Sequence, residues 1–187
     1  QRPAPREGSM VRSNHLMRYR ERPPTLYDFT IHFDLTFLAA GTSYYVGGVW
    51  ARDEANPQHK YLIDLVRKRG DFVEQMAEIR RMVATYPQAT KVVIEDMANG
   101  SAAIATLRRE LKSPPVIAVR PSKSKEARMS AVLPEFQAGN VWIPEQAPWV
   151  AEYEHELTTF PNSSNDDQVD MTTQALLDYQ KDPFVLI

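Results

Sequence analysis

Three groups of carboxylates, far apart in the sequence, are the residues of this chain best suited to chemistry. They are Asp34, the adjacent pair Glu95 and Asp96, and the cluster Asp166, Asp167 and Asp170. Carboxylate oxygens are preferred ligands of hard divalent cations such as Mg²⁺ and Mn²⁺. Two such ions about 3.5–4 Å apart can activate a water and stabilise the leaving oxygen of a phosphodiester. If the fold brings the three groups together, the sequence favours metal-dependent phosphodiester hydrolysis.

The first two groups also have ordinary structural explanations. Asp34 lies within an alternating strand pattern, where an ionised carboxylate is costly unless it is paired or binds a cation. A strand aspartate that faces solvent or meets an arginine explains Asp34 equally well. Glu95 follows a buried Val-Val-Ile run, at the carboxyl end of a strand where ligands gather in α/β sheets. It can instead stabilise the dipole of the helix that follows.

The third group opens a predicted helix. Asp166 and Asp167 both share a helical face with Asp170. Capping and interaction with the helix dipole explain one or two of these acids. Three acids on one turn repel one another unless a cation intervenes, so a functional interpretation is favoured.

A basic stretch complements the acids, although the formal net charge of the chain is only −2. Residues 105–130 contain seven lysines and arginines against two glutamates, whereas residues 145–182 contain nine carboxylates and a single lysine. Within the basic stretch, Lys123, Lys125 and Arg128 are predicted to hold a DNA phosphate backbone. A solvated helix face is the alternative. The near-neutral total therefore does not exclude nucleic acid as a partner.

The sequence lacks the residues of several other common kinds of functional site. The chain has no cysteine, hence no disulfide, thiol nucleophile or thiolate metal site, and no Gly-x-x-x-x-Gly-Lys-Ser/Thr phosphate loop. The four histidines lack metal-ligand spacing. His32 is expected to be packed or hydrogen-bonded, with support of Asp34 as the alternative. No apolar run reaches the roughly 18 residues of a membrane span, so no membrane contact is expected.

The pattern of apolar residues predicts one α/β domain. Strands are predicted at 29–38, 44–52, 59–67, 91–95 and 116–119, and helices at 71–86, 101–112, 124–138, 147–159 and 166–181. The first three strands, joined by short connections that include a turn at 39–43, predict an antiparallel meander. The later alternation of strands and helices predicts a mixed sheet covered on both faces. Residues 1–27, with four prolines and no sustained period, predict a linker arm, and residues 28–187 the folded domain.

These motifs resemble the C-terminal nuclease domain of DNA-packaging terminase large subunits from tailed phages. The resemblance rests on Ile-His-Phe-Asp-Leu-Thr-Phe at 31–37, Val-Ile-Glu-Asp-Met-Ala-Asn-Gly at 93–100, Phe-Pro-Asn at 160–162 and Asp-Asp-Gln-Val-Asp at 166–170. The segment 121–128 resembles the stretch between the family's second and third acidic motifs, and residues 1–8 resemble its interdomain linker. One departure is Asn165, where many relatives have histidine.

The resemblance implies a ribonuclease H-like fold and a metal-dependent endonuclease that cuts concatemeric viral DNA with little sequence specificity. It implies Mg²⁺ or Mn²⁺, with two ions expected, on Asp34, Glu95, Asp167 and Asp170. Asp34 is expected to bridge both ions, Asp166 competes within the third motif, and Asp96 competes more weakly within the second. Implied partners are double-stranded DNA, an ATPase domain of the full-length protein, the portal and the small terminase subunit. The implied location is the host cytoplasm during virus assembly.

Two alternatives stay open from the sequence. A structure-selective junction resolvase of the same fold would use the same acids on branched DNA. A catalytically silent module that docks on DNA or on the portal would not bind metal at all.

Overall fold

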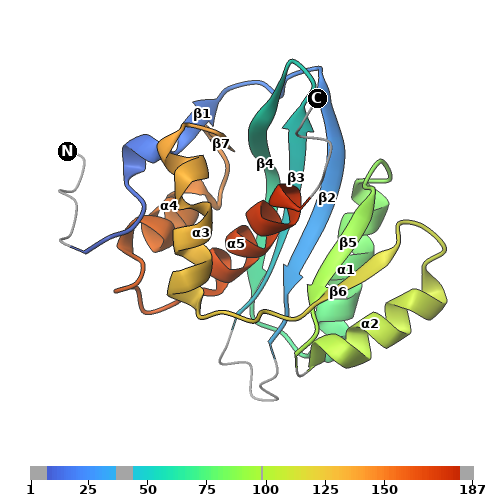
Figure 1. Ribbon diagram of the computed structural model, residues 1–187. Helices are drawn as coiled ribbons and strands as arrows, with labels where there is room; N and C mark the ends of the chain where they lie inside the picture. The colour runs from blue at the N-terminus through green and yellow to red at the C-terminus, as the bar shows by residue number, and fades with distance from the viewer. Residues whose placement is uncertain (1–7, 37–43, 98, 182–187) are drawn as a thin grey trace.

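Seven strands form one mixed sheet in the computed structural model of the chain, which describes residues 8–36, 44–97 and 99–181 (Figure 1). In chain order they are β1 (Met17–Tyr19), β2 (Leu26–Asp34), β3 (Tyr45–Asp53), β4 (Asn56–Lys68), β5 (Lys91–Glu95), β6 (Val116–Val119) and β7 (Val141–Pro144). Across the sheet the order is β1-β7-β4-β3-β2-β5-β6. β2, β3 and β4 pair antiparallel, and the other neighbours pair parallel. The predicted meander followed by parallel strands is confirmed.

Helices cover both faces of this sheet, as predicted. The described helices are η1 (Ser13–His15), α1 (Phe72–Thr85), α2 (Asn99–Glu110), α3 (Lys125–Gln137), α4 (Val150–Thr159) and α5 (Asp167–Gln180). Buried residues of α1 and α2 share one hydrophobic core with the sheet, and buried residues of α3, α4 and α5 share the other. In Figure 1, α5 crosses the middle of the sheet on one face, while α1 lies behind it on the opposite face. None of the described helices is long and apolar enough to cross a membrane.

The central strand β2 packs against both layers. Ile31 and Phe33 are fully buried in the core formed with α1 and α2. Thr30 and His32, which alternate with them along the strand, face α5, because successive strand residues point to opposite faces. Thr30 Oγ1 donates to Tyr179 Oη at 2.9 Å, and His32 Nδ1 lies 3.2 Å from Gln174 Oε1. The polar face predicted for this strand is thus covered by a helix rather than by water.

His32 is a packed residue, which confirms the structural interpretation. It is fully buried, and its Nε2 lies 3.0 Å from Thr30 Oγ1. Burial lowers the pKa of His32 to about 4, so the ring is neutral at physiological pH. It supports the contact between β2 and α5 rather than the carboxylate of Asp34.

A glycine lets α5 approach the sheet closely. A Cβ on Gly48 of β3 would lie 2.5 Å from Met171 Sδ of α5. Carbon and sulfur do not pack at that separation, so a larger residue at this position would require the flexible end of the Met171 side chain to move. Gly48 therefore leaves room for Met171, on the helix that also carries Asp167 and Asp170.

Several predicted boundaries differ from the structure. β2 ends at Asp34 rather than at residue 38, so Asp34 closes the strand instead of lying within it. β4 begins three residues earlier than predicted. The helices agree with their predictions to within three residues at each end. Phe37, residue 38 and the predicted turn at 39–43 lie outside the described residues.

Two short strands and the packing of the N-terminal segment are corrections to the sequence prediction. β1 and β7 pair with each other, and β7 also pairs with β4. Val11 and Leu16 are buried in the core formed with α3, α4 and α5. Residues 8–27 are therefore not an unfolded arm, because their apolar side chains complete a core. Residues 1–7 lie outside the described residues, and a linker role between domains stays a prediction.

Candidate active site

Two of the predicted acids lie side by side at the carboxyl ends of neighbouring strands. Asp34 is the last residue of β2, and Glu95 is the last residue of β5. The two strands are parallel, with Phe33 opposite Ile94. Parallel pairing places both carboxyl ends at one edge of the sheet, which is where α/β proteins bind ligands. The positions predicted from separate motifs are thus brought together by strand register.

The turn after β5 depends on a glycine. Gly100, at the start of α2, lies so close to β5 that a Cβ would come within 1.9 Å of the Glu95 carbonyl oxygen. Only glycine permits this approach without movement of the backbone. Any larger side chain would therefore displace the backbone that carries the Glu95 carboxylate.

The remaining acids come from the first turn of α5, whose N-terminus is fixed by a residue of α4. Glu156 is buried, and its Oε1 accepts from the backbone N–H of Gln168 at 2.6 Å and of Val169 at 3.2 Å. Its Oε2 accepts from the Gln168 side-chain amide at 2.7 Å. The first N–H groups of a helix lack partners within the helix and carry a partial positive charge. Glu156 satisfies them in place of Asp166, whose side chain makes no capping bond.

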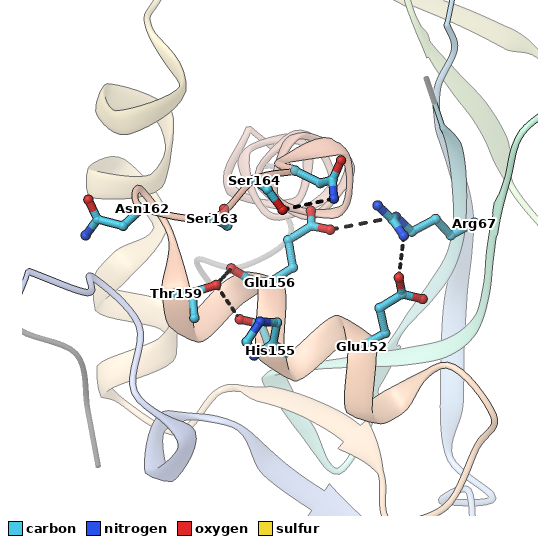
Figure 2. Close-up of a pocket in the computed structure, with 9 residues that line it drawn as sticks. Arg67, Glu152, His155, Glu156, Thr159, Asn162, Ser163 and Ser164 are labelled. Carbon is cyan, nitrogen blue, oxygen red and sulfur yellow. Dashed lines mark hydrogen bonds and ion pairs between the residues drawn. The ribbon is translucent and has the colours of Figure 1, made fainter. Parts of the chain in front are cut away.

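Arg67 of β4 supports the same helix terminus. Figure 2 shows the Arg67 guanidinium pointing toward Glu156 and Glu152, with which it forms ion pairs. The three residues line a pocket of about 250 Å³. Arg67 Nη2 also lies 3.9 Å from Asp167 Oδ2, and the guanidinium stacks 3.6 Å from the centre of the Tyr44 ring. This arginine therefore connects the end of β4 to the acids of α4 and α5.

The four acids predicted to be catalytic line one cleft. Its volume is about 470 Å³, and its walls come from the ends of β2 and β5, the segment before α3, and the start of α3 and α5. The lining residues are Asp34, Leu35, Thr36, Tyr44, Glu95, Met97, Pro121, Lys123, Lys125, Arg128, Asp167 and Asp170. The three basic residues predicted to bind DNA line the same cleft. Acidic and basic side chains from separate stretches of the sequence thus line one site.

Two of the basic residues form ion pairs with the acids. Lys125 Nζ lies 2.6 Å from Asp166 Oδ1 and 2.7 Å from Asp170 Oδ2. Arg128 Nη2 lies 2.7 Å from Asp170 Oδ1, and its Nη1 lies 3.7 Å from Glu95 Oε2. Lys123, by contrast, is exposed at the cleft and makes no ion pair among the described residues. Contact of these three residues with DNA stays a prediction.

The environment of the cleft opposes ionisation of its carboxylates. Burial, followed by repulsion from Asp170, Glu95 and Asp167, raises the pKa of Asp34 well above its ordinary value. Burial also raises the pKa of Glu95 and Asp170, although neighbouring cations oppose both shifts. For Asp167, burial and the nearby charge of Glu156 raise the pKa to about 6. Asp170 is buried and the other three acids are partly buried, and carboxyl groups with raised pKa values in such a setting are stabilised in their charged form by additional positive charge.

The donor set of the cleft fits a divalent cation of the magnesium class, which takes oxygen ligands and favours carboxylates. Among the described residues, no three histidine or carboxyl side chains converge closely enough to hold a metal ion as they stand. Lys125 and Arg128 also form ion pairs with carboxylate oxygens that a metal could use. Metal binding would require the side chains of the cleft to move.

Two weaker candidates lie outside the cleft lining. Asp96 pairs with Arg120 at 2.9 Å and accepts from Ser101 Oγ, and these contacts lower its pKa, the hydrogen bond from Ser101 most. Asp166 is held by Lys125 at the N-terminus of α5. Neither is among the described residues that line the cleft. The structure thus places Glu95, Asp167 and Asp170 in the cleft ahead of their competitors.

Glu156 and Arg67 are functional candidates that sequence patterns do not single out. Glu156 is one of several acids in α4, and Arg67 is the penultimate residue of β4, in a basic run. Their importance follows from contacts with α5, which lies far away in the sequence. The one indication in the sequence was the repulsion predicted among the three acids at the start of α5, which implies that this helix terminus needs partners.

Comparison with known proteins now decides the family. The family model of the terminase RNaseH-like domain matches residues 31–178. The chain belongs to this family. The matched range begins before Asp34 and ends after Asp170, so it includes every acid predicted for the site.

Solved structures agree with the fold of this terminase domain. The large terminase nuclease from thermophilic phage G20c with bound magnesium is 17% identical, with a TM-score of 0.64 over 95% of this chain and 99% of that chain. The large terminase of another thermophilic bacteriophage, in complex with ADP, is 11% identical, with a TM-score of 0.64 over 93% of this chain and 43% of that chain. The Holliday junction resolvase of fowlpox virus is 12% identical, with a TM-score of 0.54 over 81% of this chain and 97% of that chain.

These similarities confirm the predicted ribonuclease H-like mixed sheet of this terminase domain. Comparison of the sequence with curated proteins gives no match.

Proposed function

We propose that this terminase domain is a divalent-metal-dependent endonuclease that cuts concatemeric viral DNA during genome packaging. The observation that carries the proposal is the convergence of Asp34, Glu95, Asp167 and Asp170, from three separate parts of the chain, on one cleft. The raised pKa values of these groups add a requirement for cations. Membership of the terminase family supports double-stranded DNA as the substrate.

The proposed ligands line the cleft. Asp34, Glu95 and Asp170 would hold two Mg²⁺ or Mn²⁺ ions, and Asp167 is favoured over Asp166 as the further ligand. When bound, the ions would supply an activated water and stabilise the oxygen that leaves the phosphodiester. A G20c terminase nuclease of the same fold has been solved with bound magnesium, which supports this class of ion.

The basic residues of the cleft would divide between holding DNA and positioning acids. Lys123 is exposed at the cleft and is the side chain best placed to meet a backbone phosphate. Arg128 is buried and holds Asp170 close to Glu95, so its role is to position acids. Phosphate contacts do not read bases, so cutting would show little sequence specificity.

The full-length protein would supply the other parts of a packaging machine. The phage terminase solved in complex with ADP is a longer chain, and this domain matches 43% of it. We infer from this relative that an ATPase domain belongs to the same protein. Contacts with the portal and the small terminase subunit, and action in the host cytoplasm during virus assembly, are further parts of the proposal.

Cleavage of supercoiled plasmid tests this function. With millimolar Mn²⁺ or Mg²⁺, we expect nicked and then linear plasmid, and no product when a chelator is present. The cut positions, read by sequencing the ends, should be widely distributed. Binding of Mn²⁺ to the chain without any cleavage, across protein and metal concentrations, would contradict the proposal.

The junction resolvase is the second candidate, because a fowlpox virus resolvase has the same fold. A four-way junction and a linear duplex of equal length separate the two functions. An endonuclease for packaging should cut both substrates at similar rates, whereas a resolvase should cut the junction far faster. A docking module without catalysis would bind no Mn²⁺ in calorimetry at millimolar concentration.

A further inference from the structure

Asp170 is held by a different cation on each of its carboxylate oxygens. Arg128 Nη2 lies 2.7 Å from Oδ1, and Lys125 Nζ lies 2.7 Å from Oδ2. Lys125 reaches Asp166 as well, at 2.6 Å, so one ammonium group joins two acids at the N-terminus of α5. Both cations come from the first turn of α3, which Ser124 caps by accepting from the Ala127 N–H. Both carboxylate oxygens of Asp170, one of the expected metal ligands, are therefore already occupied by side chains of α3.

The two cations differ in their freedom to leave. The Arg128 side chain is 9% exposed and also approaches Glu95, so it is enclosed by the site. The Lys125 side chain is 43% exposed. A lysine is a flexible point charge that exchanges partners easily, whereas a buried arginine holds a fixed geometry. Of the two side chains, only that of Lys125 is exposed enough for its ammonium group to move into solvent.

A divalent cation and the Lys125 ammonium would compete for the same oxygens. Both would use Asp170 Oδ2, and a doubly charged ion repels a nearby ammonium group about twice as strongly as a singly charged group does. The pairs formed by Lys125 must therefore be broken or lengthened before a metal ion can use Asp170 Oδ2. The energy of these pairs then subtracts from the free energy of metal binding.

We propose that Lys125 is an exchangeable internal counter-ion, which holds Asp166 and Asp170 in the metal-free protein and releases Asp170 when a divalent cation binds. The inference rests on the proposed function, because it takes Asp170 to be a metal ligand. Lys125 is thus a positioning residue that sets the metal affinity of the site. After its release, the ammonium group remains at the cleft, where a DNA phosphate can become its partner.

Calorimetric titration of the intact chain with Mn²⁺, without DNA, tests this role. We expect Lys125→Met to bind Mn²⁺ about tenfold more tightly than the unmodified chain, because the competing charge is gone. Lys125→Arg keeps the charge and should bind Mn²⁺ with an affinity close to that of the unmodified chain. The matched control is Lys123→Met, which removes an exposed lysine of the same cleft that makes no ion pair among the described residues. That variant should change the affinity less than about threefold, because exposed charges are well screened.

A thermal unfolding measurement gives a second readout that does not depend on catalysis. Metal-free Lys125→Met should unfold at a lower temperature than the unmodified chain, since Asp166 and Asp170 lose their partner. Saturating Mn²⁺ should raise its midpoint by more than it raises that of the unmodified chain.

The outcomes separate this inference from the proposed function. If the unmodified chain binds no Mn²⁺, the proposed function itself fails. If it binds Mn²⁺ and Lys125→Met binds equally or more weakly, the counter-ion role is wrong while the nuclease proposal stands. If Lys123→Met and Lys125→Met gain affinity equally, the effect is general electrostatics, and the specific role of Lys125 is also wrong.

Discussion

Replacement of Asp34 by asparagine is expected to lower metal-dependent DNA cleavage at least about a thousandfold, because it removes one member of a catalytic group that acts as a unit. Asp34 closes the central strand and lines the cleft together with Glu95 and the acids of α5. Asparagine has nearly the same shape, so the strand and its packing are kept. The measurement is the initial rate of plasmid nicking at saturating Mn²⁺.

A stability measurement distinguishes loss of the site from loss of the fold. Burial and the neighbouring acids raise the pKa of Asp34, so the folded protein loses stability as the pH rises above the ordinary aspartate value. Asp34→Asn removes this penalty, and the metal-free variant should be at least as stable as the unmodified chain at about pH 7.5. The difference should shrink toward about pH 4, where Asp34 is protonated in the folded protein.

The matched control for Asp34 is Asp96. It pairs with Arg120 and is not among the described residues that line the cleft. Asp96→Asn should keep the cleavage rate within about threefold, as surface substitutions usually do. An equal loss of activity in the Asp34 and Asp96 variants would mean that the catalytic acids are assigned incorrectly.

The second large effect is expected at Glu156, which lies outside the cleft. We expect Glu156→Ala to lower the free energy of unfolding by about 3–5 kcal/mol, because it leaves Arg67 and the N–H groups at the start of α5 without their buried acceptor. Where the variant is still folded, cleavage should also fall, about a hundredfold for a displacement near 1 Å of the acids on that turn. Urea unfolding and plasmid nicking at low temperature measure the two effects.

Glu152→Ala is the control for this prediction. Glu152 lies on the same helix and pairs with the same arginine, but its side chain is 60% exposed. Its removal should cost less than about 1 kcal/mol, as is usual for exposed ion pairs. A loss of stability at Glu152 as large as that at Glu156 would mean that Arg67, rather than the start of α5, is the important partner.

The acids of the site were predictable from the sequence for a physical reason. Asp34 and Glu95 each follow a recognisable strand pattern, and parallel pairing of β2 and β5 brings two such strand ends together. Asp167 and Asp170 are three residues apart on one helix, so a shared face follows from helical geometry. Local patterns therefore contain most of the information about the acids that line the cleft.

The partners of these acids were not predictable in the same way. The pairs of Lys125 and Arg128 with Asp170 depend on how α3 packs beside α5, and no local pattern records that packing. The same is true of the hydrogen bonds from the start of α5 to Glu156 on α4. Ion pairs between distant elements are products of the whole fold.

The missed strands have a different cause. β1 has three residues and β7 has four, including Pro144, so neither gives a sustained alternation. Their position in the sheet is fixed by pairing with each other and with β4, and by the burial of Val11 and Leu16 beneath the neighbouring helices. Tertiary packing, not local preference, makes this segment part of the domain.

Crystals of the unmodified chain soaked in Mn²⁺, with the ions located by anomalous scattering, test the central claim most directly. We expect manganese in the cleft, bound by Asp34 and Glu95 together with Asp170 and with Asp167 or Asp166, and the Lys125 ammonium withdrawn from Asp170. Manganese bound only elsewhere, such as at Asp96 or in the pocket of Figure 2 beside Glu152 and His155, would contradict it.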